Sequence, residues 1–232
     1  MLSIRWNGKD SYKDFGATIK SYTHGFPKKN NYIVQVPYSS KPIDFTQLHK
    51  ESYGTRELSY VFNLICSDIN KMDQLITKFC NWIMAGNSFQ SLFDISERYH
   101  FMAQCINCQP TTRHNTCELT VTFLAEPYRL SFDYSQAKWD TFSFETDYLN
   151  QTEFPAARGK VYTFYNYGTA PICPTIIYIP DGASSRCTIN FDGAYNIEET
   201  SKFDDFIFQV GANQFTVTGK GTVKFSAIEE VL

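Results

Sequence analysis

The sequence lacks the excess of positive charge that is typical of nucleic-acid-binding proteins. Its 232 residues contain 21 lysines and arginines against 24 aspartates and glutamates, which gives a formal net charge of −3. Affinity for nucleic acid comes largely from neutralising phosphates and releasing their counterions. This balance therefore argues against DNA as a tightly bound partner.

Histidine is also scarce, and the sequence shows no motif of an enzyme. The four histidines are His24, His49, His100 and His114, and three of them lie in polar loop or arm context, where we interpret them as solvated side chains. A nucleophilic triad forms in space rather than in sequence, but no carboxylate pair stands out as an acid/base couple. We therefore expect neither an enzyme nor a bound cofactor.

Long apolar runs are absent as well. Residues Met1–Arg5 are not followed by the apolar segment of a secretory signal, and no stretch approaches the roughly 20 apolar residues of a membrane span. The seven cysteines are odd in number and scattered, and a chain of this length does not need disulfides for stability. We expect reduced thiols, no membrane span, and folding in a cytoplasm.

One cysteine cluster has a spacing that deserves a test against metal binding. Its members are His100, Cys105, Cys108, His114 and Cys117, and a Cys-x-x-Cys pair followed by a further His and Cys can form a tetrahedral zinc site. Strand residues three apart, however, point to opposite faces, and Ile106-Asn107 does not suit the tight turn of a zinc knuckle. A redox pair needs a helix N-terminus. We therefore expect free thiols on a hairpin and no metal.

The second half of the chain alternates short strands with turns. Apolar and polar residues alternate with period two in Gln214–Thr218 and Thr222–Phe225, which predicts half-buried strands. Asp192-Gly193 predicts a tight hairpin turn between two more strands. Gly219-Lys220-Gly221-Thr222 resembles part of a phosphate loop but lacks the following helix, so we predict a hairpin turn there too. Several short strands separated by turns predict a β-sandwich, with its core at residues 161–232.

The first half, residues 1–130, has a mixed character that predicts an α+β domain. Apolar residues recur at helical spacing between Ser67, the expected N-cap, and Gly86, the expected C-terminal stop. A polar, proline-containing stretch from Thr23 to Lys50 predicts an extended arm, with a strand at its middle. The expected strands are an opening strand with Ile4 and Trp6, Phe15–Lys20, Tyr32–Val36, Arg56–Cys66, Tyr99–Cys108 and Cys117–Leu124.

Two further expectations concern the end of this domain. Gln109–Thr116 is predicted as a turn-rich segment between the last two strands, and Glu126-Pro127-Tyr128 is predicted to end the second of them. Residues 128–160 lose regularity, and residues 131–160 are predicted as a linker. Aromatic residues make up 16% of the chain, which is typical of a β-rich core and also allows part of this surface to serve subunit contacts.

The order of these elements resembles the distal tail protein (Dit) family of long-tailed bacteriophages over nearly the whole chain. In the first half the resemblance rests on Trp6-Asn7-Gly8, Asp14-Phe15-Gly16, Val36-Pro37, the strand and helix from Thr55 to Gly86, and the closing Val121–Tyr128. In the second half it rests on the entry strand Asn166–Pro171 and on Gly211-Ala212-Asn213. The arm departs from the family's pattern, since Val36–Ser40 stands where a glycine-rich turn is usual.

The resemblance implies a structural virion protein at the distal end of the tail, assembled in the bacterial host cytoplasm. Family members form a hexameric ring that joins the tail tube to the adsorption apparatus and lets DNA pass. Expected partners are the tail tube protein, a tail-tip or tail-associated lysin protein, and receptor-binding or baseplate proteins. The fold implied is a ring-forming α+β domain followed by a galectin-like β-sandwich.

The arm supplies the candidate contact residues of such a ring. An unpaired strand edge seeks a partner strand, and a head-to-tail ring can close through an arm that reaches its neighbour. The candidates for the oligomer interface are Tyr32, Val34, Val36, Pro37 and Tyr38.

Two other functions remain open from the sequence. A tail-tube or tube-terminator protein shares the strand-helix-strand construction, although such a subunit needs only the first half of this chain. A carbohydrate-binding module for host attachment would present exposed aromatic side chains, for which Tyr178, Tyr195 and Phe208 are candidates, each equally suited to a strand or core position. A hydrolase has no motif in its support.

Overall fold

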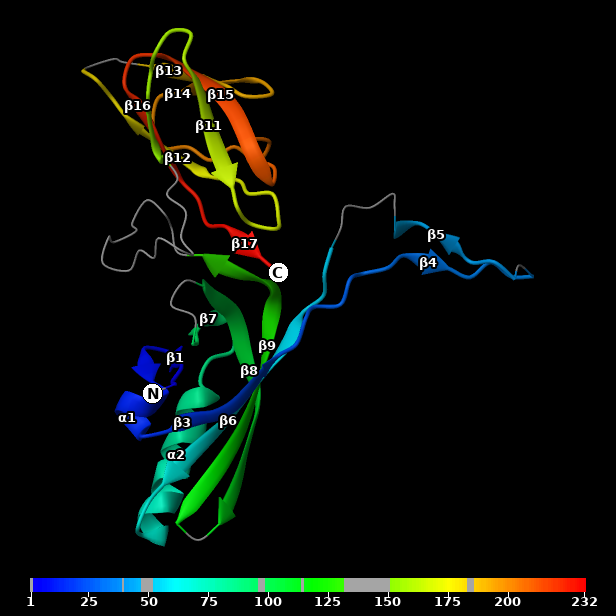
Figure 1. Ribbon diagram of the computed structural model, residues 1–232, viewed down its shortest axis with the longest axis vertical. Helices are drawn as coiled ribbons and strands as arrows, with labels where there is room; N and C mark the ends of the chain where they lie inside the picture. The colour runs from blue at the N-terminus through cyan, green and yellow to red at the C-terminus, as the bar shows by residue number, and fades with distance from the viewer. Residues whose placement is uncertain are drawn as a thin grey trace. The chain divides into compact units, whose positions relative to one another are not determined.

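The structure, a computed structural model, forms two compact units (Figure 1). It describes residues 2–38, 40–46, 52–95, 99–113, 115–131, 151–182 and 186–232. The first unit comprises residues 1–129 with Leu232, and the second comprises residues 130–231. The predicted fold class is confirmed: the chain is β-rich, with an α+β part followed by a β-sandwich.

A twisted sheet and one long helix make up the body of the first unit. The strand order is β2-β1-β7-β8-β9-β6-β3. The strands are β1 (Arg5–Trp6), β2 (Lys9–Asp10), β3 (Thr18–His24), β6 (Arg56–Ile65), β7 (Gln90–Phe93), β8 (Tyr99–Arg113) and β9 (Thr116–Ser131), and the helices are α1 (Ser11–Phe15) and α2 (Ile69–Ile83).

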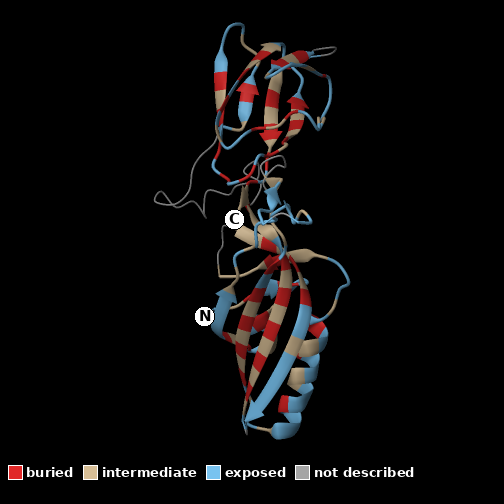
Figure 2. Cartoon of the chain, turned by 90° about the vertical axis from the view of Figure 1, so that its right-hand side faces the viewer, coloured by how far each residue is buried: buried red, intermediate tan, exposed pale blue. Residues whose placement is uncertain are grey.

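Strict alternation in the sequence decides which face of this sheet is buried. Along β6, Leu58, Tyr60, Phe62 and Leu64 are fully buried and the residues between them are not, which Figure 2 shows as stripes along the strands. The helix α2 places its own apolar stripe, including Met72 and Phe79, in the same core cluster. The sheet therefore has one face covered by α2 and one face open.

The ends of α2 follow from local hydrogen bonding. The N-cap is Asp68, whose Oδ1 accepts from Asn70 N at 2.9 Å, so the predicted N-cap Ser67 is wrong by one residue. A carboxylate both satisfies the free N–H and suits the positive end of the helix dipole. Past the last helical residue, Ile83, Gly86 has a φ of 104°, a conformation that turns the chain towards β7 and favours glycine.

The short helix α1 was not predicted. Asp10 caps it by accepting from Tyr12 N at 2.8 Å and Lys13 N at 3.0 Å, and Gly16 ends it with a φ of 70°. One turn of helix has no periodicity to detect, which is why the sequence suggested a strand over Phe15–Lys20 instead. The strand β3 begins only at Thr18 and continues to His24.

The hairpin of β8 and β9 is longer than expected at both ends. β8 reaches Arg113 and β9 begins at Thr116, so most of the predicted turn segment Gln109–Thr116 is strand. β9 also passes through Pro127 and ends at Ser131. The ladder between β6 and β9 stops at Arg56 opposite Ala125, so Pro127, which has no N–H to donate, does not interrupt that ladder.

The second unit is a sandwich of two small antiparallel sheets. Their strand orders are β10-β16-β12 and β11-β15-β13-β14. The strands are β10 (Glu153–Pro155), β11 (Val161–Asn166), β12 (Thr175–Ile179), β13 (Cys187–Asn190), β14 (Ala194–Ile197), β15 (Gly211–Gly219) and β16 (Thr222–Ser226). The last strand, β17 (Glu230–Val231), belongs to neither of these sheets and pairs with β9. Buried aromatic side chains fill the space between the sheets, Phe154, Phe164, Phe206, Phe208 and Phe225 among them.

The range expected for the linker differs from the structure at its C-terminal end. The strand β10 lies within the predicted linker 131–160, yet Phe154 is fully buried and pairs with Val223 of β16. A three-residue strand is too short to show alternation, so the sequence gives little sign of it. Residues 132–150 lie outside the described part of the chain.

One predicted hairpin is confirmed and the other is wrong. β13 and β14 pair across Phe191–Gly193, with Asp192 at a φ of 47°. By contrast, Gly219-Lys220-Gly221 joins two strands of different sheets: β15 pairs with β11 and β13, and β16 with β10 and β12. This turn is therefore a crossover from one layer of the sandwich to the other.

Candidate subunit interface

The arm lies between β3 and β6. Its strands β4 (Ile33–Val34) and β5 (Ile43–Asp44) form a separate two-stranded sheet, in register from Ile33↔Asp44 to Val34↔Ile43. β4 is shorter than the predicted strand Tyr32–Val36. In the described part of the chain each of the two strands has only the other as its ladder partner, so each offers an edge to a further strand.

The two legs of the arm are paired well before this small sheet begins. Gly25 N donates to Glu57 O at 2.9 Å, Gly54 N to Lys28 O at 2.9 Å, and Asn30 N to Ser52 O at 3.0 Å. Figure 1 shows the result as a narrow ribbon that continues β3 and β6 and then broadens into β4 and β5. The described residues of the arm therefore form a hairpin.

The predicted interface residues lie on this arm, and four of the five are exposed. Tyr32 is 43% exposed, Val34 is 50% exposed and Tyr38 is fully exposed; Pro37 is exposed and Val36 is half-buried. Their neighbours Ile33 and Ile43 are 55% and 47% exposed. Apolar side chains gathered on a projecting hairpin expose the kind of surface that protein contacts bury. Whether they bury it against another subunit stays a prediction.

The tip of the arm contains an uncommon backbone conformation. Pro37 and Tyr38 form a turn in which Tyr38 has a φ of 65°. The left-handed region is unfavourable for a bulky residue and suits glycine. Tyr38 thus adopts a backbone conformation that glycine would take at lower cost.

A buried arginine fixes the root of the arm. Arg56 is only 4% exposed, and its Nε donates to Gly25 O while an Nη donates to Pro127 O, both at 2.9 Å. Its guanidinium also lies over the rings of Phe26 and Phe101 at 5.6 and 5.2 Å. The arm leaves the sheet at Gly25 and returns to it at Arg56. The hydrogen bonds of the Arg56 side chain therefore connect both legs of the arm to β9.

A second polar group lies beside this root. His24 Nε2 is 3.1 Å from the carboxylate of Asp94, a side chain that is 3% exposed, and 3.0 Å from the hydroxyl of Tyr60. Burial, followed by the charge of Asp94, raises the pKa of Tyr60, which keeps this phenol neutral. The interpretation of the arm histidine as solvated is wrong for His24, because β3 extends further than predicted and places it against the core.

Cysteine and histidine residues of the predicted hairpin do not form a metal site in the part of the chain that the structure describes. The Sγ of Cys108 lies 3.3 Å from that of Cys80, yet no three ligands converge among the described residues. The ring of His100 stacks on Phe93 at 5.0 Å. His114 and His49 lie outside the described residues.

Of the three aromatic residues considered for sugar binding, Tyr178 and Phe208 are buried in the sandwich and Tyr195 packs against its core. Phe208 is fully buried, and Tyr178 is 8% exposed with its hydroxyl donating to Lys220 O at 2.8 Å. Tyr195 is half-buried against Phe203 and Phe206. A sugar platform needs open ring faces beside polar groups, and these rings do not supply one.

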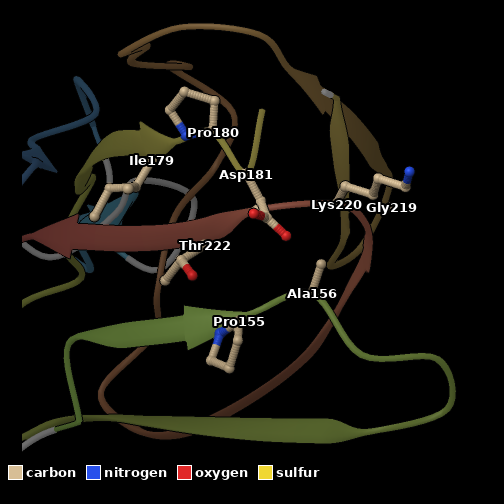
Figure 3. A pocket seen from close by; sticks show the side chains of 9 residues that line it. Pro155, Ala156, Ile179, Pro180, Asp181, Gly219, Lys220 and Thr222 are labelled. Carbon is tan, nitrogen blue, oxygen red and sulfur yellow. The ribbon is translucent and has the colours of Figure 1, made fainter. Parts of the chain in front are cut away.

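A shallow pocket of about 430 Å³ lies at the crossover turn of the sandwich (Figure 3). Its lining residues are Pro155, Ala156, Ile179, Pro180, Asp181, Gly219, Lys220, Gly221 and Thr222. Figure 3 shows the Asp181 carboxylate directed into the pocket and the Lys220 side chain directed away from it. One carboxylate among prolines and glycines is neither an acid/base couple nor a phosphate cradle.

Two buried asparagines explain the short motifs of the second half. The amide nitrogen of Asn166 donates to Ala170 O at 2.8 Å, and its oxygen accepts from Gly168 N at 2.9 Å. Asn213 likewise donates to Gln209 O at 2.7 Å and accepts from Gln209 N at 2.8 Å. Each side chain pairs backbone groups of a bend that the ladders leave unpaired.

The fold of the chain is similar to that of a phage hub protein. One solved structure that it matches is that of the Dit protein of SPP1, described as a paradigm of the hub adsorption apparatus in phages that infect Gram-positive bacteria. The match has a TM-score of 0.71 and 11% sequence identity and covers 100% of both chains. No protein-family model matches the sequence, and no curated protein matches it significantly. The likeness is therefore one of fold.

The similar protein is described as part of a hub adsorption apparatus. No helix among the described residues is long and apolar enough to span a membrane. The residues at the root of the arm could not be recognised from the sequence. Arg56 is the first residue of a predicted strand and has no distinguishing pattern around it. Asp94 contacts His24, which is far away in sequence, so no local pattern pointed to it.

Proposed function

We propose that this protein is a structural virion protein that forms a homohexameric ring at the distal end of a phage tail. The ring joins the tail tube to the proteins of the adsorption apparatus, among them a tail-associated lysin and receptor-binding or baseplate proteins. The observation that supports this most is the match over the full length of both chains to a phage hub protein.

The arm is the proposed clasp between subunits. It offers open strand edges and the exposed apolar side chains Ile33, Val34 and Tyr38, and Arg56 holds its root in place. A strand added to an open edge gains backbone hydrogen bonds as well as apolar contacts. In a cyclic ring the arm of each subunit meets a different surface on the next subunit. Each subunit therefore contributes its own arm to one neighbour and binds the arm of the other neighbour.

The open face of the large sheet is the proposed lining of the DNA channel. Along β9 this face carries Thr116, Thr120 and Thr122, and its acidic Glu118 is paired with Lys20. Hydroxyl groups and paired charges give DNA no cluster of cations to bind, so the ionic contacts that slow DNA are few. The chain's net charge of −3 acts in the same direction.

The test of the ring is size-exclusion chromatography with light scattering, followed by negative-stain microscopy. We expect single or paired rings of six subunits. Stacked tubes would favour a tail-tube protein instead, and a monomer at high concentration would contradict the proposal. The second unit disfavours the tube, since a tube subunit needs only the first.

The clasp is tested by two changes in the arm. Deleting Pro27–Pro42 and, separately, Val34→Lys are expected to give folded monomers. Val210→Lys is the matched control, because Val210 is a similarly exposed valine (53% against 50%) in the second unit. Rings that persist after the deletion would show that the arm is not the clasp, while leaving the hub role itself to be judged from the wild-type rings.

A further inference from the structure

We propose that Cys80 and Cys108 form an oxidisable dithiol that a small-molecule disulfide converts into a disulfide between α2 and β8. The two Sγ atoms lie 3.3 Å apart although the residues are 28 positions apart in sequence. A disulfide bond is about 2.05 Å long, so closing the gap requires the sulfurs to approach by roughly 1.3 Å, which small side-chain rotations can supply.

The other cysteines are arranged differently. The Sγ of Cys105 is directed at Met84 Sδ, 3.4 Å away, and that of Cys173 at Phe203 O, 3.1 Å away. Cys117 interacts with Thr112 Oγ1 and is fully buried. Cys80 and Cys108 are both half-buried at the margin of the core, and their sulfurs contact each other. A small oxidant thus has access to this pair from solvent.

The reaction balances as a thiol–disulfide exchange. A thiolate of the pair attacks one sulfur of oxidised glutathione, which gives a mixed disulfide and releases one glutathione thiol. The second protein thiolate then attacks the protein sulfur of that mixed disulfide and releases the other. Two protein thiols lose two protons and two electrons, and one glutathione disulfide becomes two thiols.

The surroundings of the pair set its rate. Burial, together with the hydrogen bond and the charge shared with Cys80, raises the pKa of Cys108. Because only the thiolate attacks, attack by Cys108 is slow at neutral pH and faster at alkaline pH. The dithiol therefore persists in a reducing cytoplasm and closes on long exposure to an oxidising medium.

The expected consequence of closure is a more stable first unit. A cross-link between residues distant in the chain lowers the entropy of the unfolded state, and this one ties α2 to the sheet that it covers. We expect a higher Tm for the oxidised protein than for the reduced protein. The proposal does not depend on the ring, since both thiols belong to one chain.

The experiment uses the purified full chain, incubated at pH 8.5 with oxidised glutathione or with dithiothreitol. After acid quenching and denaturation, the remaining thiols are labelled with a maleimide and counted by mass, and non-reduced peptides are mapped. We expect a loss of two thiols and a linked peptide pair that contains Cys80 and Cys108. Cys80→Ser and Cys108→Ser should each abolish the link and the shift in Tm, whereas Cys173→Ser should keep both.

Retention of all thiols in the folded wild-type protein would overturn the proposal, as would a link that maps to another pair. A stable mixed disulfide on one of the two cysteines, with no closure, would overturn it as well. The mapping on wild-type protein decides the question even if a serine variant fails to fold.

Discussion

At the scale of single residues, buried polar side chains hold the irregular parts of this chain. Asn166 and Asn213 each satisfy several backbone groups around a bend. The segments that contain them were noted only because their residues resemble short motifs of the Dit family. Hydrogen bonding of a side chain to its own bend leaves no periodic pattern, so the physical role of these residues could not be predicted.

Asp10 offers a pH-dependent test at the same scale. Burial acts to raise the pKa of this carboxyl, but hydrogen bonds from Lys13 N, Tyr12 N and the Ser3 hydroxyl outweigh it, and the pKa is lowered from 3.8. A carboxyl with a lowered pKa stabilises the folded state above its ordinary pKa and loses this contribution as the pH falls through the folded value.

We therefore expect Asp10→Ala to lower the free energy of unfolding by about 1 kcal/mol at pH 7, the usual loss for an N-cap. The difference from wild type should shrink as the pH falls below 3.8. Asp10→Asn keeps a capping oxygen without the titration, so the difference between Asp10→Asn and Asp10→Ala should stay nearly constant with pH. Urea denaturation at pH 7 and at a pH below 3.8 measures these free energies of unfolding. A difference between Asp10→Ala and wild type that does not change with pH would contradict the prediction.

At the scale of elements, the crossover turn depends on a glycine for two reasons. Gly219 has a φ of 107°, and a Cβ placed there would lie 2.3 Å from Arg186 O. Gly159 has a comparable φ of 73° but open space around it. Alanine substitutions at Gly219 and Gly159 therefore separate the free-energy cost of the backbone conformation from the free-energy cost of the close approach.

We expect Gly219→Ala to destabilise the protein by about 3 kcal/mol or more, and Gly159→Ala by only about 1 kcal/mol, the strain of the left-handed backbone alone. Thermal and urea denaturation of both variants check the difference. Equal losses would mean that the backbone of β13 moves away from the added methyl group without cost.

Elements with regular periodicity were the ones that the sequence could predict. The alternation of β6, the stripe of α2 and the turn at Asp192 are local patterns, and each is confirmed. The strand partners are not local. Nothing in Gly219–Gly221 shows that β15 and β16 belong to different sheets, and a tight turn between two alternating strands looks the same in a hairpin and in a crossover.

At the scale of the molecule, the division into two compact units predicts two separable unfolding transitions. Arg56→Met leaves Gly25 O and Pro127 O without their donor in the first unit, and Asn213→Ala does the same to the backbone around Gln209 in the second. Each should cost about 2–3 kcal/mol, as unsatisfied buried groups do. Calorimetry should show each variant lowering a different transition.

The double variant should show both shifts unchanged, because residues without shared contacts act additively. Asn196→Ala, an exposed asparagine of the sandwich, is the control and should leave both transitions within about 0.5 kcal/mol of wild type. A single transition that both substitutions lower together would contradict the independence of the units.

The order of elements along the whole chain was a better guide to the fold than any one motif. Short segments such as Asn166–Pro171 resembled the family only when taken together with the others, and the structural match covers the full length of both chains. The contacts of a ring lie between copies of the chain. A single chain shows only their preconditions, here the exposed residues of the arm and the buried Arg56.

The way the arm joins the sheet also determines how the molecule bears force. A pull on the tip passes down both legs and into β3 and β6 along their axes. β6 is joined to β9 by a ladder that runs from Arg56↔Ala125 to Ile65↔Thr116. Tension along a strand loads all the hydrogen bonds of such a ladder in shear at once, whereas peeling would break them one by one. An arm anchored in this way resists a pull along its length, because many hydrogen bonds must break together.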